Sequence, residues 1–180
     1  MEFYFDTETT GTDPKNDKII TIQWQELNRV TGEAIGELKI LKEWESSEEG
    51  ILRAFLPLIQ CSNPWSFIVI GKNLMFDFNF LDRRAREYGL KGLELSDCHN
   101  LVFLDLKHIL VMINKGEFKG YDKVLDTTGE LGSVDVPMLY KRGQYADILA
   151  YIAKEAKVFQ KGFRMLKNKL PELREHLSES

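Results

Sequence analysis

Two acidic residues near the N-terminus have the spacing of a metal-binding pair. Asp6 and Glu8 directly follow the aromatic run 3–5, which is typical of a buried strand. Side chains alternate across a strand, so Asp6 and Glu8 share one face while Thr7 points to the other. Two such carboxylates repel each other and lose hydration, and oxygen ligands of this kind suit Mg²⁺ or Mn²⁺. An isolated Asp-x-Glu is more often a solvated pair at a strand end, so the interpretation depends on the rest of the chain.

A second segment carries a further acidic residue, Asp77. It follows an apolar stretch at 66–70 and lies in the first turn of a helix expected over 76–88. The junction between a buried strand and a helix, at the carboxyl edge of a sheet, is where α/β proteins place ligands. The alternative is an acidic residue that only complements the helix dipole.

A third segment lies on a long helix expected over 145–166. Tyr151 and Glu155 are four residues apart and therefore share one face of this helix. Asp147 also lies four residues before Tyr151, but Asp147 and Glu155 are about 12 Å apart along the helix axis. Only one of them can join a compact site. The alternative is a surface Glu beside a half-buried Tyr.

The elements that position these residues can be predicted from periodicity and turn signals. Ile20, Ile22 and Trp24 alternate with polar residues, as in a strand. The expected strands are 2–7, 18–26, 36–41, 66–70 and 101–105, and the expected helices are 46–60, 76–88, 107–115, 119–125 and 145–166, with a loop at 126–143. A meander followed by alternating strands and helices predicts an α/β fold. We expect a five-stranded mixed sheet with helices on both faces, the second strand antiparallel to its neighbours, and 2–7 beside 66–70.

Length and composition limit the classes of protein. The 180 residues suit a single domain over 1–170 with a polar tail at 171–180, either a frayed helix or disordered. A net charge of −4 argues against a nucleic-acid binder that relies on a global positive field, although clustered carboxylates contribute to that charge. Cys61 and Cys98 form no CxxC pattern, so neither zinc nor a disulfide framework is indicated. We find no signal peptide or membrane span and expect a cytoplasmic protein.

Taken together, the three segments resemble the DEDD superfamily of 3′–5′ exonucleases, which have the ribonuclease-H-like fold. FDTETTG at 5–11 matches the first motif, and GKNLMFDFNFL at 71–81 matches the second, with Lys72 where His is usual. YIAKEA at 151–156 resembles the tyrosine form of the third motif, with Glu155 in place of Asp. The alternative third motif needs an Asp five residues after a His, which none of the histidines has: His99, His108 and His176. The resemblance is therefore to the tyrosine branch, related to the proofreading domain of family B DNA polymerases.

The resemblance implies two divalent ions, Mg²⁺ or Mn²⁺, that clamp the scissile phosphate. It assigns Asp6 to both ions, Glu8 and Glu155 to the ion beside the nucleophile, and Asp77 to the other ion. Tyr151 would orient the attacking water. A Glu is one methylene longer than the usual Asp. Three consequences are open: Glu155 is a bidentate metal ligand, it shifts the position of the second metal, or it marks a weakened enzyme.

The resemblance also implies contacts to the substrate. Backbone amides of the loop after the first strand would meet the terminal nucleotide, from Thr9, Thr10 and Gly11. Asn73 would contact the nucleotide or support the metal ligands, and Phe76 would stack on a base unless it belongs to the core. Three lysines would meet phosphates unless they are solvated surface residues: Lys72, Lys115 and Lys119.

The predicted function is a two-metal-dependent 3′–5′ exonuclease acting on the 3′ ends of single-stranded DNA or RNA. One alternative is a non-catalytic or weakly active nucleic-acid-binding module that keeps the fold, which only Glu155 favours. The other is a phosphohydrolase of oligonucleotides or nucleotides on the same fold. Incubation of the purified protein with labelled single-stranded DNA and RNA, with and without Mn²⁺, would distinguish these three functions.

Overall fold

The computed structural model describes residues 1–93, 101–113, 115–117 and 134–178. Its strands are β1 (Glu2–Thr9), β2 (Ile19–Leu27), β3 (Ala34–Lys42), β4 (Ile68–Gly71) and β5 (Phe103–Asp105). Its α-helices are α1 (Glu48–Ile59), α2 (Leu74–Glu87), α3 (Leu106–Ile113), α5 (Val136–Lys141) and α6 (Tyr145–Ser178). Short 3-10 helices cover Glu43–Glu45 and Pro64–Ser66. Within the described ranges, no helix has the length and apolar character needed to span a membrane.

The strands form one five-stranded sheet in the order β3-β2-β1-β4-β5. β2 pairs antiparallel with β1 and β3, whereas β4 pairs parallel with β1 and β5. This arrangement confirms the predicted α/β class, the mixed sheet and the adjacency of the first and fourth strands. Because β1 and β4 run parallel, their carboxyl ends meet at the same edge of the sheet, and residues that follow them can converge there.

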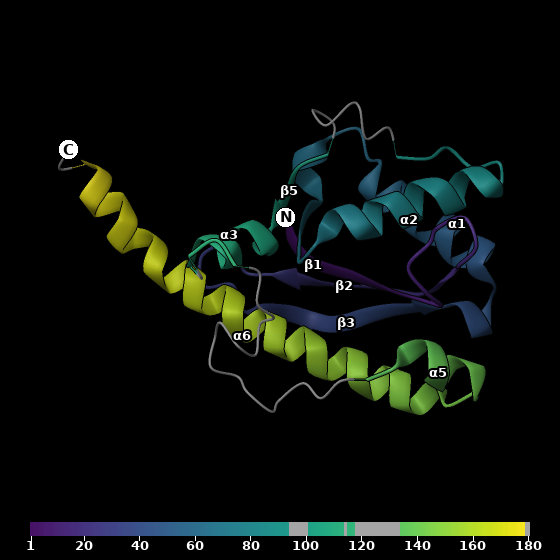
Figure 1. The fold of residues 1–180 in the computed structure, drawn as a ribbon. Coiled ribbons are helices and arrows are strands. Elements are labelled where there is room, and N and C mark those ends of the chain that lie inside the picture. The colour runs from purple at the N-terminus through teal and green to yellow at the C-terminus, as the bar shows by residue number, and fades with distance from the viewer. Residues whose placement is uncertain (94–100, 114, 118–133, 179–180) are drawn as a thin grey trace.

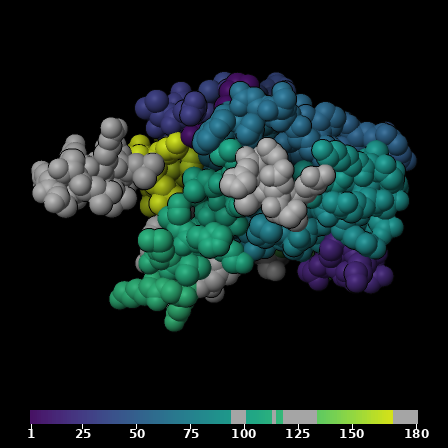
Figure 2. Space-filling model, turned by 90° about the horizontal axis from the view of Figure 1, so that it is seen from above, coloured from purple at the N-terminus to yellow at the C-terminus, as the bar shows by residue number. Residues whose placement is uncertain are grey.

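Helices cover both faces of the sheet, as predicted (Figure 1). α1 and α2 pack on one face, where the rings of Phe5 and Phe55 stack with centroids 5.1 Å apart. Seen from above, this blue and teal part of the chain forms the surface on that side (Figure 2). α6 runs along the opposite face, where Tyr4 packs against Phe159 with ring centroids 4.7 Å apart. Neighbouring side chains of β1 thus anchor in two separate hydrophobic layers, which holds the strand rigidly between them.

One detail of the predicted alternation in β2 is wrong. Ile22 and Trp24 pack in the hydrophobic layer beneath α1 and α2, but Ile20 packs with residues of α5 and α6 on the other face. The reason is a shift in the register of β1 and β2 between Glu8 and Thr9, which breaks the strict alternation of the strand at that point.

The starts of two helices depend on side-chain caps. Ser47 caps α1 by accepting a hydrogen bond from the amide of Gly50 at 3.0 Å. α2 begins two residues earlier than expected, at Leu74, after Asn73 in the left-handed conformation with φ 61°. Its first amides are satisfied by Asp105 of β5, which accepts from Asn73 N at 2.7 Å and Leu74 N at 2.9 Å.

Other boundaries differ from the predictions. The segment 136–141, predicted as loop, forms the helix α5. Its six residues are too few to give a periodic apolar pattern in the sequence. Asp135 caps this helix by accepting a hydrogen bond from Met138 N. α6 continues to Ser178, so the polar segment 171–178 is helical. β4 begins at Ile68 because Pro64–Ser66 forms a 3-10 helix. The helix predicted at 119–125 lies outside the described residues, whereas α3 agrees with the piece expected at 107–115.

Candidate active site

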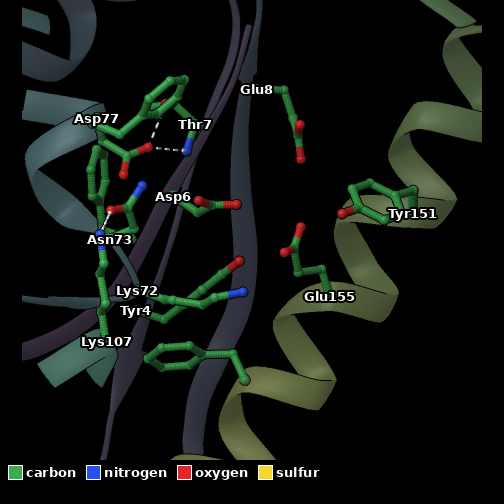
Figure 3. A pocket seen from close by; sticks show the side chains of 13 residues that line it. Tyr4, Asp6, Thr7, Glu8, Lys72, Asn73, Asp77, Lys107, Tyr151 and Glu155 are labelled. Carbon is green, nitrogen blue, oxygen red and sulfur yellow. Dashed lines mark hydrogen bonds between the residues drawn. The ribbon is translucent and has the colours of Figure 1, made fainter. Parts of the chain in front are cut away.

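A pocket of ≈ 330 Å³ lies between β1 and α6, at the edge of the sheet where β1 and β4 end (Figure 3). Its walls come from β1, from the β4–α2 junction, from the start of α3 and from α6. Five residues predicted to do chemistry line it: Asp6, Glu8, Asp77, Tyr151 and Glu155. Three segments far apart in the sequence therefore converge on one space.

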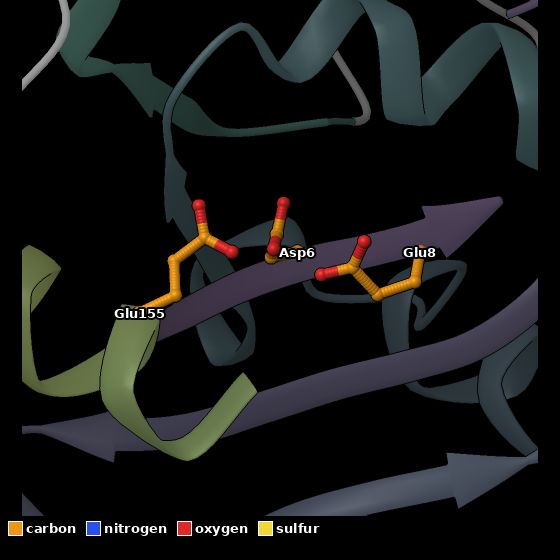
Figure 4. Close-up of side chains that lie close together, drawn as sticks. All are labelled: Asp6, Glu8 and Glu155. Carbon is orange, nitrogen blue, oxygen red and sulfur yellow. The ribbon is translucent and has the colours of Figure 1, made fainter. Parts of the chain in front are cut away.

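Three of the carboxylates form a tight cluster (Figure 4). One oxygen from each of Asp6, Glu8 and Glu155 lies within 4.8 Å of the others. β1 presents Asp6 and Glu8 on the same face because they are two residues apart. α6 crosses that face and supplies Glu155. Three oxygen ligands that converge in this way fit a hard divalent cation such as Mg²⁺ or Mn²⁺.

The cluster is electrostatically strained in the absence of a cation. Burial raises the pKa of Asp6 well above its usual value, and the charges of Glu155, Asp77 and Glu8 raise it further. Burial also raises the pKa of Glu8, followed by the charges of Glu155 and Asp77. Buried like charges favour protonation, and a bound cation would remove that penalty.

Asp77 lines the same pocket but is not a member of the three-oxygen cluster. Its Oδ1 accepts hydrogen bonds from Thr7 Oγ1 at 2.6 Å and from Thr7 N at 3.1 Å. Thr7 points away from Asp6 and toward α2, as the alternation of β1 predicts. Burial raises the pKa of Asp77 to about 7, even though the hydrogen bonds from Thr7 act in the opposite direction. One oxygen of Asp77 is thus committed to holding β1 and α2 together.

Tyr151 and Glu155 face the pocket from successive turns of α6, and the Tyr151 hydroxyl points toward the carboxylates (Figure 3). Burial raises the pKa of Tyr151, and the charges of Glu155 and Glu8 raise it further. The phenol therefore stays protonated and acts as a donor rather than a base. Burial likewise raises the pKa of Glu155, against the opposing influence of Tyr151 and Lys72. Asp147 is exposed and accepts a hydrogen bond from Gln144, so Glu155 is the α6 carboxylate that joins the cluster.

The predicted substrate residues fall into two groups. Asn73 and Phe76 line the pocket, and Phe76 also packs against Phe80 at 4.9 Å between centroids. Thr9 and Thr10 do not line it: Thr9 Oγ1 donates to the carbonyl of Gly11 at 2.6 Å, and Thr10 N donates to the carbonyl of Lys18 at 2.9 Å. Their hydrogen bonds shape the loop that follows β1.

Gly11 lies close to Asp17 in that loop. A Cβ at this position would lie 2.3 Å from the Asp17 carboxylate, so a larger residue would require the Asp17 side chain to move. Among the lysines predicted to meet phosphate, Lys72 lines the pocket, Lys115 is exposed outside it, and Lys119 lies outside the described residues.

Sequence reasoning missed three residues at the site. Gln23 of β2 is 0% exposed and donates from Nε2 to Asp6 Oδ2 at 3.1 Å, directly across the β1–β2 pairing. Asp105 holds the β4–α2 loop, and Lys107 donates from Nζ to Asn73 Oδ1 at 2.7 Å. The available signal was a polar residue facing the carboxylates from the neighbouring strand, and an acidic residue at the carboxyl end of the last strand.

Comparisons with known proteins agree with this fold. A family model described as the RNase_H superfamily matches residues 3–155. The structure of E. coli exonuclease I in complex with a dT13 oligonucleotide superposes with a TM-score of 0.66 at 14% identity, over 98% of this chain and 43% of that one. The zinc-bound form of the E. coli exonuclease I complex with single-stranded DNA gives 0.65 at 13% identity, over 99% and 42%. This chain therefore spans less than half of that enzyme, and a comparison with curated protein sequences finds no significant match.

Proposed function

The chain belongs to the RNase_H superfamily, and from that premise we propose that it is a metal-dependent 3′–5′ exonuclease acting on single-stranded nucleic acid. The observation that carries the proposal is the convergence of Asp6, Glu8 and Glu155, with ligand oxygens within 4.8 Å of one another, in a pocket that also holds Tyr151 and Asp77. Carboxylates that are clustered away from water repel one another and destabilise the fold, unless a bound cation neutralises their charge.

In this proposal Asp6, Glu8 and Glu155 would hold one divalent ion, and Asp77 would help to hold a second. When bound, such ions lower the pKa of water and stabilise negative charge on the phosphate oxygens, which is the chemistry that phosphodiester hydrolysis requires. The donor set supports this assignment because all of its ligand atoms are carboxylate oxygens.

The remaining residues position the reacting groups. Gln23 fixes the orientation of Asp6 through its hydrogen bond at 3.1 Å, and Thr7 fixes Asp77. Tyr151, held protonated by burial, donates a hydrogen bond that orients the attacking water. Changing Tyr151 to Phe would therefore slow hydrolysis while leaving metal binding intact, because only the hydroxyl is lost.

We propose single-stranded DNA as the preferred substrate, because the similar solved structures include exonuclease I bound to a dT13 oligonucleotide. Asn73 and Phe76 at the pocket wall would contact the terminal nucleotide. The position of Glu155 inside the cluster supports an active enzyme over a binding module that has lost activity. In an inactive module the longer Glu155 side chain would have no reason to converge with Asp6 and Glu8.

The test is digestion of 5′-labelled single-stranded DNA and RNA with and without Mn²⁺. We expect 5′-labelled products that shorten by single nucleotides, only when metal is present, and no digestion by the Asp6→Asn variant. The control is an internally labelled single strand compared in its linear and circular forms, because the circle has no 3′ end. Equal digestion of circular and linear strands would contradict the exonuclease assignment and indicate an endonuclease.

A further inference from the structure

Two lysines line the active-site pocket without a role in the metal chemistry proposed above. Lys72 comes from the junction of β4 and α2, and Lys107 comes from the first turn of α3. Both are half-buried. Figure 3 shows Lys72 beside Tyr4, at the end of the pocket away from Glu8. The pocket is therefore divided along its length into an acidic end and a basic end.

Lys107 belongs to one hydrogen-bonded unit with the residues that directly follow Lys72. Asp105 accepts hydrogen bonds from Asn73 N at 2.7 Å, Leu74 N at 2.9 Å and Lys107 N at 2.9 Å. Lys107 Nζ donates to Asn73 Oδ1 at 2.7 Å. The loop that carries Lys72 and the helix that carries Lys107 are thereby fixed to each other. These bonds fix the backbone positions of both lysines and the side chain of Lys107, which lowers the entropy that the subsite loses when it binds a ligand.

Gly71 allows this unit to lie close to the catalytic strand. A Cβ at Gly71 would lie 2.7 Å from the carbonyl oxygen of Phe5 and 2.4 Å from the Leu74 side chain. The loop therefore sits directly against β1, one residue before Asp6. Ammonium groups so close to a site for divalent cations would repel those cations, unless an anion lies between them.

We propose that Lys72 and Lys107 form a subsite for the phosphodiester next to the scissile one, on its 5′ side. The inference rests on the proposed function, because the acidic end must hold the scissile phosphate for the basic end to receive its neighbour. Lysine ammonium groups bind phosphate as point charges, without reading the base. The subsite makes the pocket selective for a polymer with at least two phosphodiesters over a simple nucleotide ester.

Three substrates distinguish binding of the neighbouring phosphodiester by Lys72 and Lys107 from an effect of these lysines on the scissile phosphate. The first is an oligo-dT strand, and the second is the same strand with a neutral methylphosphonate at the linkage next to the scissile one. The third is the p-nitrophenyl ester of thymidine 5′-monophosphate, which has a single phosphodiester. Lys72→Gln should lower kcat/KM on the first substrate about tenfold, as expected for a lost charge-assisted hydrogen bond, and leave the other two unchanged. Lys107→Gln should act in the same direction.

The exposed Lys154 provides a matched control, since Lys154→Gln removes one charge from α6 outside the pocket. An equal loss on all three substrates would overturn the inference, because Lys72 would then act at the scissile phosphate or on the metal ligands. No loss on any substrate would overturn it as well.

Two further readouts keep this inference separate from the proposed function. Stabilisation by Mn²⁺ in thermal melts should persist in Lys72→Gln, because the three clustered carboxylates are intact. Affinity for labelled oligo-dT, measured by fluorescence anisotropy in the Asp6→Asn background, should fall about tenfold on adding Lys72→Gln. A wild-type protein that cleaves none of the substrates would overturn the proposed function, while the affinity measurement would still decide the subsite. Unchanged affinity would refute the subsite.

Discussion

Two groups of carboxylates in this protein, one buried and one half-buried, have opposite electrostatic surroundings. Glu48 at the start of α1 is 3% exposed and is fully paired. It accepts two hydrogen bonds from the Arg84 guanidinium at 2.8 and 2.7 Å, one from Ile19 N at 2.8 Å and one from the Tyr88 hydroxyl at 2.9 Å. These contacts join α1, α2 and β2 on one face of the sheet.

The cluster on the other face has the opposite balance. Asp6, Glu8 and Glu155 approach one another. Burial raises the pKa of all three, and neighbouring carboxylates raise the pKa of Asp6 and Glu8 further. The comparison teaches that burial of a carboxylate is not by itself a sign of function. What distinguishes the candidate site is that its carboxylates face each other, whereas Glu48 faces a guanidinium.

The largest effect on stability is expected where the paired carboxylate loses its cation. Arg84→Met keeps apolar bulk but leaves Glu48 buried and uncompensated, so the free energy of unfolding should fall by about 3–5 kcal/mol. Urea denaturation measures this change. The control is Arg53→Met, which removes an exposed i,i+4 pair with Glu49 and should cost less than about 1 kcal/mol. Similar losses in the free energy of unfolding for the two variants would show that the buried Glu48–Arg84 pair contributes no more than an exposed ion pair.

The next largest effect concerns the cluster. Glu155→Ala should reduce cleavage by about 10²–10³-fold, because it removes one of the three converging ligands. Unlike Arg84→Met, it should leave the free energy of unfolding of the metal-free protein unchanged or raised. Glu155→Asp should retain activity. Rates on single-stranded DNA measure the loss of cleavage, and urea denaturation measures the free energy of unfolding. Undiminished cleavage by Glu155→Ala would reject Glu155 as a metal ligand.

Divalent metal should stabilise the protein through the cluster alone. At 100 times the dissociation constant, Mn²⁺ should raise the free energy of unfolding by about 2.7 kcal/mol through mass action. Asp6→Asn should abolish this response, whereas Arg84→Met should preserve it, since Glu48 and Arg84 lie outside the pocket. Thermal melts with and without Mn²⁺ measure the response. An unchanged response in Asp6→Asn would show that the metal binds elsewhere.

The smallest expected effect, taken per pH unit, is the dependence of metal-free stability on pH. A carboxyl with a raised pKa makes the folded state bind more protons than the unfolded state, from the unfolded value near 4 up to the folded pKa. With the pKa of Asp77 at about 7, stability should be greatest near pH 4 and fall as the pH rises toward 7. One pKa unit of one group corresponds to about 1.4 kcal/mol. Urea denaturation in chelator measures the slope, and stability that rises with pH would contradict the raised pKa values.

The sequence was enough to predict which side chains share a face of one strand or helix. The shared face of Asp6 and Glu8 follows from the two-residue period of a strand, and that of Tyr151 and Glu155 follows from the helical turn. The mixed α/β sheet followed from the order of apolar segments, since a meander and later parallel strands leave few ways to bury them. Short elements such as 136–141 escaped because one or two turns carry no periodic signal.

Which residues of different helices and strands come together was decided by the tertiary structure. The sequence offered both Asp147 and Glu155, and only the crossing of α6 over β1 selects Glu155. Likewise, the pairing of Asp77 with Thr7 and the convergence of Lys72 with the acidic cluster depend on how strands and helices pack. The physical reason is that backbone geometry sets the direction of side chains within an element, whereas the distance between two elements depends on the packing of every residue between them.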